Sequence, residues 1–235
     1  MDKKIKLSKI IFLLVLVMGF LLSACLDDYN HHYYDYDNLA ASYGLIQTSS
    51  STSGQSYVIN LDNGSIVTPT SALAGFNPKD SDRVWVRFDP ISNTRLTDST
   101  FNYTAKIFSI NDILFKAVNK LSQVSEDSVG HDPIIVTDAW ISPKDILNLN
   151  FKFFTEGSVH YINLLDNGEG DGVANPYILE LRHNARGDMN QYPAYGIVSF
   201  KLNSLRVQGQ NQIKFFIRYT DYNGNRIDIP KIYYY

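Results

Sequence analysis

Hydrophobic and polar side chains alternate along much of the second half of the chain. At 147–153 and 213–219 every second position is Leu, Phe, Ile or Tyr, and most intervening positions are Asn, Lys or Arg. A period of two is typical of a strand with one face on a core and the other in water. Further strands are expected at 134–140, 158–165, 176–183, 195–202 and 226–233. Seven short strands in about 100 residues predict an antiparallel β-sandwich over residues 130–235.

The first half holds shorter runs of β-forming residues, at 43–48, 57–61, 65–68, 84–88 and 101–108. Asp62-Asn63-Gly64 separates two of them, and Asn-Gly is a strong hairpin signal because both residues tolerate a positive φ. Four or five short strands in about 80 residues predict a small OB-like β-barrel over residues 39–121. Both domains are therefore expected to be all-β, since strands do not alternate with long helical patterns as they do in α/β proteins.

Three stretches are expected to be something other than strand. The Ser/Thr/Gly-rich run at 48–56 predicts a loop. Apolar residues at 114, 117, 118 and 121 recur at the spacing of one helical face, which predicts a short helix at 111–121. The polar segment 119–133 is expected to mark the boundary between the two domains.

A positively charged, apolar leader opens the chain. Four lysines precede an uncharged apolar run at residues 10–22, whose 13 residues are too few for a bilayer span of about 20 residues. Such a run fits the apolar region of a secretory signal peptide. It ends in Leu22-Ser23-Ala24-Cys25, which resembles a bacterial lipobox. Residues 1–24 are therefore expected to be a cleaved signal peptide, and Cys25 to become a lipid-modified N-terminus.

Lipidation of Cys25 leaves the mature chain without a free thiol. Cys25 is the only cysteine in the sequence, so the fold must rest on apolar burial and backbone pairing rather than on disulfides. Residues 25–38 are expected to form the lipidated N-terminus and a flexible polar tether. The neighbouring His31 and His32 in this tether are expected to be solvated, because an unordered segment does not fix metal-ligand geometry.

The charge of the mature chain bears on its partners. Removal of the leader leaves 17 Lys and Arg residues against 23 Asp and Glu residues, a formal charge of −6. An acidic chain lacks the basic footprint of a nucleic-acid binder, so no nucleic-acid partner is expected. No second apolar run approaches the length of a membrane span, so the lipid on Cys25 is the expected membrane attachment.

The sequence carries no catalytic signature. There is no Gly-x-Ser-x-Gly, and serines concentrate in the loop-like run at 49–53. No spacing marks two carboxylates as the acid and base of a glycosidase. A Ser-His-Asp triad stays open, because the order of its members differs between folds. We expect no catalytic residue, no cofactor and no metal site.

Several further features have both a structural and a functional interpretation. His160 and His183 lie on expected strands and could approach each other, but without a third ligand they are expected to bond backbone or Tyr rather than zinc. The acidic, glycine-rich run at 166–172 is expected to be a hairpin loop, with weak calcium binding as the alternative. Arg186-Gly187-Asp188 is expected to build a turn rather than an integrin-type sequence. Four barrel aromatics are expected in the core, with stacking on an extended ligand as the alternative: Tyr57, Trp85, Phe101 and Tyr103.

Short motifs in a fixed order extend along the whole mature chain. They are Cys25-Leu26-Asp27-Asp28, Asn77-Pro78-Lys79-Asp80, Arg83-Val84, Asp132-Pro133-Ile134, His160-Tyr161-Ile162-Asn163-Leu164, Leu181-Arg182-His183-Asn184-Ala185 with Gly187-Asp188, and Gly196-Ile197-Val198-Ser199-Phe200. In these motifs the chain resembles the NigD-like lipoproteins of Gram-negative anaerobes. The resemblance implies an N-terminal OB-like barrel followed by a C-terminal β-sandwich, and it brings no established enzyme activity. The family takes its name from a bacteriocin-associated gene cluster.

The leader, the tether and the resemblance together favour a non-enzymatic outer-membrane lipoprotein that displays a binding or accessory module. Asp27 and Asp28, beside the lipidated cysteine, resemble surface-export signals of related lipoproteins, so exposure at the cell surface is expected. A protein or a glycan is the expected kind of partner. Two alternatives stay open: a hydrolase of envelope or dietary polymers, and a bacteriocin-associated accessory or immunity protein.

Overall fold

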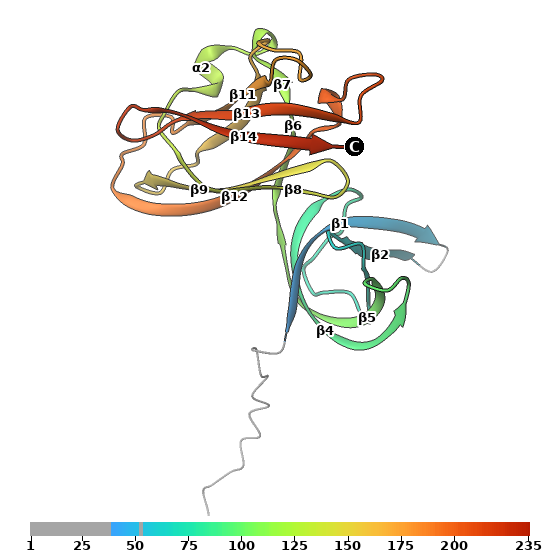
Figure 1. Ribbon diagram of the computed structural model, residues 1–235. Coiled ribbons are helices and arrows are strands. Elements are labelled where there is room, and N and C mark those ends of the chain that lie inside the picture. Colours follow the sequence, from blue (N-terminus) through green and yellow to red (C-terminus); the bar gives the residue numbers. More distant parts are fainter. Residues whose placement is uncertain (1–38, 52–53) are drawn as a thin grey trace, which may run out of the picture. The chain divides into compact units, whose positions relative to one another are not determined.

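The computed structural model describes residues 39–51 and 54–235 (Figure 1). The expected signal peptide, the lipidated Cys25 and the tether lie outside the described residues. Leu39–Tyr235 forms one compact unit. Within the described part of the chain, no helix is long and apolar enough to cross a membrane.

The first domain is a closed β-barrel with the strand order β1-β2-β3-β5-β4. Neighbouring strands are antiparallel except β3 and β5, which run parallel, as expected of a small Greek-key barrel. This confirms the OB-like barrel predicted from the sequence. Its strands are β1 (Ala40–Ser51), β2 (Gly54–Leu61), β3 (Ile66–Pro69), β4 (Arg83–Arg95) and β5 (Phe101–Asp112).

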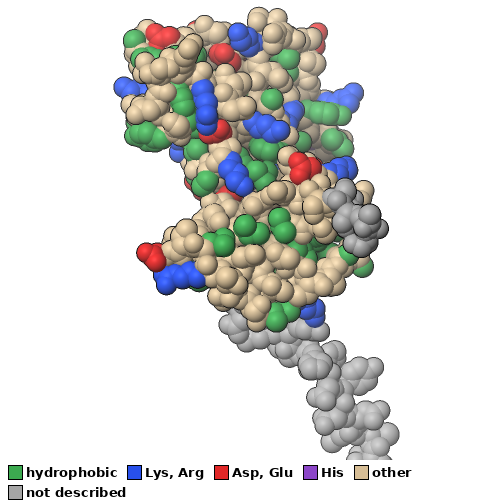
Figure 2. Space-filling model, turned by 90° about the vertical axis from the view of Figure 1, so that its right-hand side faces the viewer, with side chains coloured by type: hydrophobic (Ala, Val, Ile, Leu, Met, Phe, Trp, Pro, Cys, Tyr) green, Lys and Arg blue, Asp and Glu red, His purple; other side chains and the backbone are tan. Residues whose placement is uncertain are grey.

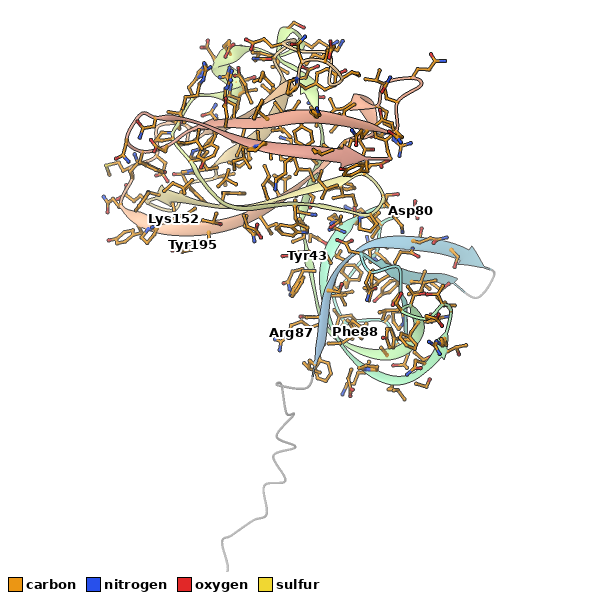
Figure 3. The ribbon with its side chains drawn as sticks, viewed as in Figure 1. Tyr43, Asp80, Arg87, Phe88, Lys152 and Tyr195 are labelled. Carbon is orange, nitrogen blue, oxygen red and sulfur yellow. The ribbon has the colours of Figure 1, made fainter. Side chains whose placement is uncertain are left out.

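Side chains along β4 alternate between the inside and the outside of the barrel. Val84, Val86 and Phe88 point inward and are buried. Trp85 and Arg87 occupy the intervening positions, and Figure 3 shows Arg87 directed away from the barrel while Phe88 points into it. Trp85 is therefore not a core residue, contrary to the sequence-based prediction, because the period of two places it on the outer face. The prediction is confirmed for Tyr57, which is buried in the barrel core.

Two segments that were expected to be irregular or helical are strand. Residues 48–51 and 54–56 of the Ser/Thr/Gly-rich run belong to β1 and β2, and Ser49 pairs with Ser56 in register. The expected helix at 111–121 is replaced by β6 (Leu114–Ala117), β7 (Asn119–Lys120) and a single 3₁₀ turn, η2 (Leu121–Gln123). In both cases backbone pairing with a neighbouring strand outweighs the local sequence signal.

The β6–β7 segment also moves the border between the domains. β6 pairs with β12, and β7 pairs with β10, both in parallel orientation. Residues 114–120 therefore belong to the sandwich sheets, although the sequence pattern placed them in the barrel. The last barrel strand ends at Asp112, ahead of the expected boundary at 119–133.

The second domain is a β-sandwich of two sheets with the orders β14-β13-β11-β10-β7 and β6-β12-β9-β8. Every strand that the period-two pattern predicts in this half is present. The strands are β8 (Ile135–Ser142), β9 (Ile146–Thr155), β10 (Tyr161–Asp166), β11 (Tyr177–Asn184), β12 (Tyr192–Lys201), β13 (Gln212–Thr220) and β14 (Arg226–Tyr234), with the short helices α2 (Glu126–Val129) and η3 (Asn203–Leu205).

The sandwich core is built from the alternating positions of both sheets. Leu147, Leu149 and Phe151 of β9 face Phe215 and Ile217 of β13 within one buried cluster. Burial of this apolar surface is the main favourable term for the domain, at about 25 cal/mol per Å² removed from water.

The C-terminal strand β14 lies at the edge of its sheet and pairs only with β13. Its tyrosines alternate between the two faces of the strand, since Tyr233 is buried and Tyr234 is 68% exposed. Pro230 lies within the strand, and Lys231 donates a hydrogen bond to the backbone oxygen of Ala139 on β8.

A buried arginine links the barrel to the sandwich. The side chain of Arg83 on β4 has no exposed surface and forms a bidentate ion pair with Asp62, at 2.5 and 2.6 Å. Its second terminal nitrogen also donates to Asn148 Oδ1 on β9, at 3.0 Å. Asn148 Oδ1 accepts a further hydrogen bond from Ser199, and its amide donates to Ser142. A polar network therefore replaces an apolar contact at this junction.

Aromatic rings pack beside that network. The ring of Tyr43 on β1 lies 4.4 Å from the ring of Trp85 and 5.6 Å from the ring of Trp140 on β8. The guanidinium of Arg83 lies 5.4 Å from the Tyr43 centroid. The outward Trp85 therefore has a packing role at the junction, which explains why the barrel core does without it.

The face of the molecule in Figure 2 shows Lys and Arg side chains interspersed with Asp and Glu. No region of one sign extends across this face. Such mixed charge is typical of a solvated surface.

Candidate functional site

Two histidines and an aspartate meet inside one end of the sandwich. His183 lies on β11, His160 directly precedes β10, and Asp188 lies in the loop between β11 and β12. His160 Nδ1 is 2.7 Å from His183 Nε2, and His160 Nε2 is 3.0 Å from Asp188 Oδ2. The side chains of His160 and Asp188 are only 4% and 5% exposed. The predicted approach of the two histidines is therefore present, with Asp188 as a third member that the sequence did not reveal.

Hydrogen-bond chemistry fixes the protons in this network. His183 Nδ1 lies 2.8 Å from the backbone oxygen of Pro133, and a carbonyl only accepts, so His183 donates there. Nε2 of a neutral His183 then accepts from His160 Nδ1. His160 Nε2 lies against the Asp188 carboxylate. A carboxylate only accepts hydrogen bonds, so His160 Nε2 donates to Asp188 Oδ2.

Asp188 is held as a carboxylate by several donors. Its Oδ2 accepts hydrogen bonds from Thr155 Oγ1 at 2.5 Å and from the backbone nitrogens of Glu156 and Ser158 at 2.9 and 3.3 Å. The hydrogen bonds from Thr155 and His160 hold the pKa of Asp188 well below its ordinary range. Removing this carboxylate would leave those donors without their acceptor.

This burial explains the Arg186-Gly187-Asp188 sequence. Arg186 and Gly187 both adopt a positive φ, and the Asp188 nitrogen bonds the Ala185 oxygen, so the predicted turn is present. The Asp188 carboxylate accepts hydrogen bonds from residues within 155–160 rather than from its own turn. An integrin-type sequence needs an exposed aspartate, so the geometry excludes that function for these residues.

The network is not arranged for catalysis. Burial lowers the pKa of His183, and the hydrogen bond to Pro133 opposes that shift only in part. Each ring nitrogen of His160 and His183 already has a partner within the protein, so neither ring is free to take a proton from a nucleophile. Among the described residues no group of three or more His, Cys, Asp or Glu side chains is placed to hold a metal ion.

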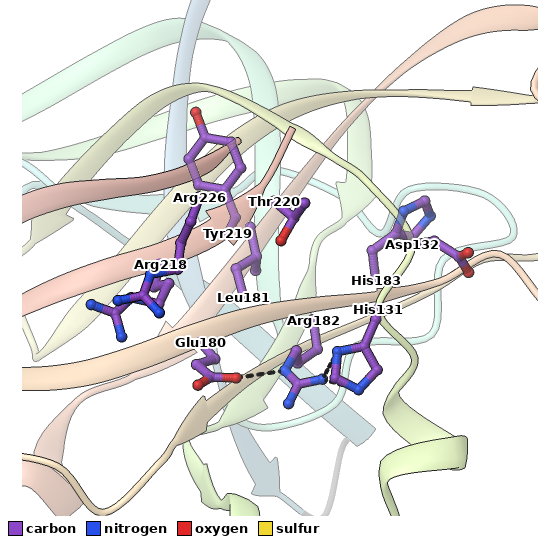
Figure 4. A pocket seen from close by; sticks show the side chains of 10 residues that line it. All are labelled: His131, Asp132, Glu180, Leu181, Arg182, His183, Arg218, Tyr219, Thr220 and Arg226. Atoms are coloured by element: carbon purple, nitrogen blue, oxygen red, sulfur yellow. Dashed lines mark hydrogen bonds and ion pairs between the residues drawn. The ribbon is translucent and has the colours of Figure 1, made fainter. Parts of the chain in front are cut away.

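A small pocket of about 120 Å³ opens beside this network (Figure 4). Arg182 crosses it, and its Nε donates to Glu180 at 2.8 Å. The other Arg182 nitrogens donate to Gly130, His131 and Glu126. Since the Arg182 donors are used within the protein and the pocket is well below the usual 300–1,000 Å³ of a small-molecule site, it is not a substrate pocket. Its lining is His131, Asp132, Glu180, Leu181, Arg182, His183, Arg218, Tyr219, Thr220 and Arg226.

Two shallower hollows are larger. One of about 370 Å³ lies on the outer face of the β8-β9-β12 sheet and includes Asn150, Tyr195 and Ile197. Figure 3 shows Tyr195 and Lys152 together on this sheet. The other, of about 590 Å³, lies beside the junction and includes Asp82, Arg83 and Lys201. In the second hollow the exposed Ser81 Oγ donates to Asp80 Oδ2 at 3.1 Å. No histidine lines either hollow, so neither has the Ser-His arrangement of a hydrolase site.

The acidic run at 166–172 forms the loop between β10 and β11, as predicted. Asp171 Oδ1 accepts hydrogen bonds from the backbone nitrogens of Val173 and Asn175, at 2.8 and 3.0 Å. These bonds lower the pKa of Asp171. Its carboxylate therefore stabilises its own loop, which gives the acidic residue a structural explanation.

The family comparison matches the second domain. Residues 117–231 match the NigD-like C-terminal beta sandwich domain. The chain carries a NigD-like β-sandwich domain. The match begins within β6, in agreement with the strand pairing, and confirms the resemblance seen in the sequence motifs. The chain matches no curated protein.

Solved structures extend the likeness over both domains. A protein of Parabacteroides distasonis, provisionally described as toxin-related, is 25% identical with a TM-score of 0.67, over 84% of this chain and 94% of that one. A NigD-like immunity protein of Bacteroides caccae is 18% identical with a TM-score of 0.62, over 84% and 97%. A protein of Bacteroides fragilis, provisionally named a lipoprotein, is 9% identical with a TM-score of 0.51, over 83% and 96%. The last two show the fold alone.

Proposed function

We propose that this NigD-like protein is an outer-membrane lipoprotein that acts without catalysis as a displayed binding or accessory module. Acyl chains on Cys25 hold it at the membrane, and residues 26–38 connect the anchor to the barrel. The observation that carries the proposal is the lipobox-like Leu22-Ser23-Ala24-Cys25 after an apolar leader. The provisional lipoprotein name of the Bacteroides fragilis structure supports an envelope location.

The chemistry of the described residues supports the non-enzymatic part. The buried titratable groups that meet closely, His160, His183 and Asp188, satisfy one another. The names of the similar structures include an immunity protein and a protein of unknown function, and none is the name of an enzyme. A hydrolase is the less supported alternative, because no histidine lines either of the two larger hollows.

Metabolic labelling tests the anchor. Cells that express the full chain are grown with radioactive palmitate, beside cells that express Cys25→Ala. We expect label in the native protein and none in the variant. An unlabelled native protein, or release of the chain into the medium without acyl mass, would contradict the proposal.

Orientation is tested on intact cells. Proteinase added outside is expected to degrade the domains, whereas a periplasmic control protein in the same cells stays intact. Protection of the chain until the outer membrane is opened would place it on the periplasmic face.

An immunity role is a second candidate, favoured by the name of the Bacteroides caccae structure. Its test is deletion of the gene, followed by exposure of the cells to bacteriocins of neighbouring strains. Increased killing that is reversed by the native gene supports immunity. Unchanged survival against the whole panel leaves the accessory role.

A further inference from the structure

At one end of the sandwich the usual placement of polar and apolar side chains is inverted. His160 and Asp188 carry the polar groups and are buried, with 4% and 5% of their side chains exposed. The residues beside them in sequence are apolar and exposed: Val159 is 72% exposed, Tyr161 43% and Met189 54%. Folding alone favours the opposite, because burying ionisable groups is unfavourable and burying apolar surface is favourable. Exposed apolar side chains beside buried ionisable ones are unfavourable for folding, so they indicate a role other than stabilising the fold.

The exposed side chains lie on or beside two loops that hydrogen bonds join. Tyr192, at the start of β12, is 65% exposed and pairs with Thr155. Gln191 donates a hydrogen bond to Glu156 across the loops. We call the surface formed by Val159, Tyr161, Met189, Tyr192 and Arg186 the loop-end surface.

The buried network holds this surface in place. Asp188 Oδ2 accepts hydrogen bonds from Thr155, Glu156, Ser158 and His160, so one carboxylate joins the two loops. A binding surface fixed before contact loses less conformational entropy when the partner arrives. The network therefore restricts the movement of the two loops that carry or flank the exposed side chains.

Arg186 gives the loop-end surface a charge preference. Its guanidinium lies 5.5 Å from the Tyr161 ring centroid and is exposed. Among the described residues Arg186 has no ion pair, and its one side-chain hydrogen bond is to the Tyr161 hydroxyl at 3.4 Å. Tyrosine, methionine and arginine are the residue types that interfaces favour. Arg186 can form an ion pair with a carboxylate of a partner molecule, and the apolar side chains can contact an apolar part of the same partner.

We propose that the loop-end surface is the docking site for a partner protein that presents an apolar patch with an acidic side chain. The apolar patch covers Val159, Met189 and Tyr192, and the carboxylate pairs with Arg186. This inference rests on the proposed function as a binding module and adds the surface and the chemistry of its partner.

Photocrosslinking in the native cells tests the surface. A photoreactive phenylalanine analogue replaces Tyr192 in the full chain, and in a second strain it replaces Tyr234, which is 68% exposed on the distant strand β14. Irradiation is expected to give a discrete, proteinase-sensitive adduct at position 192 and none at position 234. Adding Arg186→Glu to the position-192 strain is expected to reduce the adduct at least about tenfold, as reversal of one interfacial charge does. Equal chain levels and an unchanged Tm keep the strains comparable.

Other outcomes overturn the proposal. They are equal adducts at both positions, no adduct at 192, an adduct with the mass of two copies of this chain, and an adduct that is a glycan. An adduct that Arg186→Glu leaves unchanged overturns the charged contact. Palmitate labelling of the same cells separates the two proposals. If the protein is labelled but gives no adduct, only the docking proposal is contradicted. If an adduct forms on unlabelled protein, only the proposed lipid anchor is contradicted.

Discussion

Arg83 of the barrel donates a hydrogen bond of 3.0 Å to Asn148 of the sandwich, while its other bonds hold Asp62 within the barrel. One buried cation therefore serves both domains. The ion pair alone is weak grounds for stability, because desolvation offsets much of the attraction. Loss of the arginine has a larger effect, since it leaves the Asp62 carboxylate without its guanidinium donor and Asn148 Oδ1 with Ser199 as its remaining donor.

We expect Arg83→Met to lower the free energy of unfolding by about 3 kcal/mol, because it leaves a partly buried carboxylate uncompensated. Urea denaturation measures the change. Arg95→Met is the matched control on the same strand, where the ion pair with Asp98 is exposed and is expected to contribute less than about 1 kcal/mol. Equal losses in the two variants would show that the junction network is not stabilising.

Asn148→Leu is expected to destabilise the protein by about 2–3 kcal/mol, because Arg83, Ser142 and Ser199 each lose a buried partner. The double variant with Arg83→Met should be less destabilised than the sum of the two single variants, by at least about 1 kcal/mol. A thermodynamic cycle from four urea curves gives this coupling. Simple additivity would mean that the two side chains act independently.

The chain has two tryptophans, and both contact Tyr43 at the junction. Intrinsic fluorescence therefore reports on the contact between barrel and sandwich. Tyr43→Ala is expected to shift the emission to longer wavelength, because it opens both indoles to water, while the far-ultraviolet circular dichroism stays that of a β protein. Tyr195→Ala, which removes a ring that is 72% exposed, should leave the emission unchanged. An unshifted spectrum in Tyr43→Ala would contradict the packing.

The pH dependence of stability follows from His183. Burial lowers its pKa below the ordinary 6.5, so the unfolded chain binds more protons than the folded chain once the pH falls below about 6.5. The free energy of unfolding therefore has its full His183 contribution above that pH and loses it on acidification towards the folded pKa. Asp188, whose pKa is depressed from 3.8, contributes above about pH 4 and loses its contribution only at lower pH.

The variant His183→Gln tests the part of the pH dependence that comes from His183. A glutamine amide can donate to Pro133 and accept from His160, and it does not titrate. We expect the loss of stability between about pH 7.5 and about pH 5.5 to be smaller in this variant than in the native chain. Urea midpoints at the two pH values supply the comparison, and parallel curves would show that His183 does not titrate differently on folding.

Gly130 is required where the segment before β8 passes β11. Its φ is +67°, and an added Cβ would lie 2.7 Å from the His183 oxygen. Gly130→Ala is therefore expected to cost more than about 2 kcal/mol, combining left-handed strain with a backbone clash. Gly187→Ala, at φ +78° with open space around it, should cost about 1–2 kcal/mol through strain alone. Thermal unfolding of both variants makes the comparison, and equal losses would argue against the close approach.

The strands of this protein were predictable because its pattern is local. Strand β9 was predictable from the alternation of its apolar residues Leu147, Leu149 and Phe151 alone. The same holds for β13 and β14. The predicted helix at 111–121 was wrong because four apolar residues matched a helical period by coincidence. Residues 114–120 pair with β12 and β10, which come much later in the chain, and no local pattern encodes that pairing.

The candidate site was predictable only in part. His183 lies on β11 and His160 directly precedes the neighbouring strand β10, so the sequence could place the two residues near each other. Asp188 reaches them from a loop, 28 residues beyond His160, and nothing in its turn-like surroundings indicated a buried carboxylate. The available sequence signal was Val159, which lies between the polar residues Ser158 and His160. If this segment alternates like a strand, an exposed Val159 requires that the polar His160 points inward.

The edge strand β14 has a consequence for contact between copies of this chain. An open strand at the edge of a sheet would let two copies pair and extend into a continuous sheet. Pro230 removes one backbone donor from that strand, and Lys231 reaches over to β8. Neighbouring copies of this chain therefore meet an edge strand that resists joining into a continuous sheet.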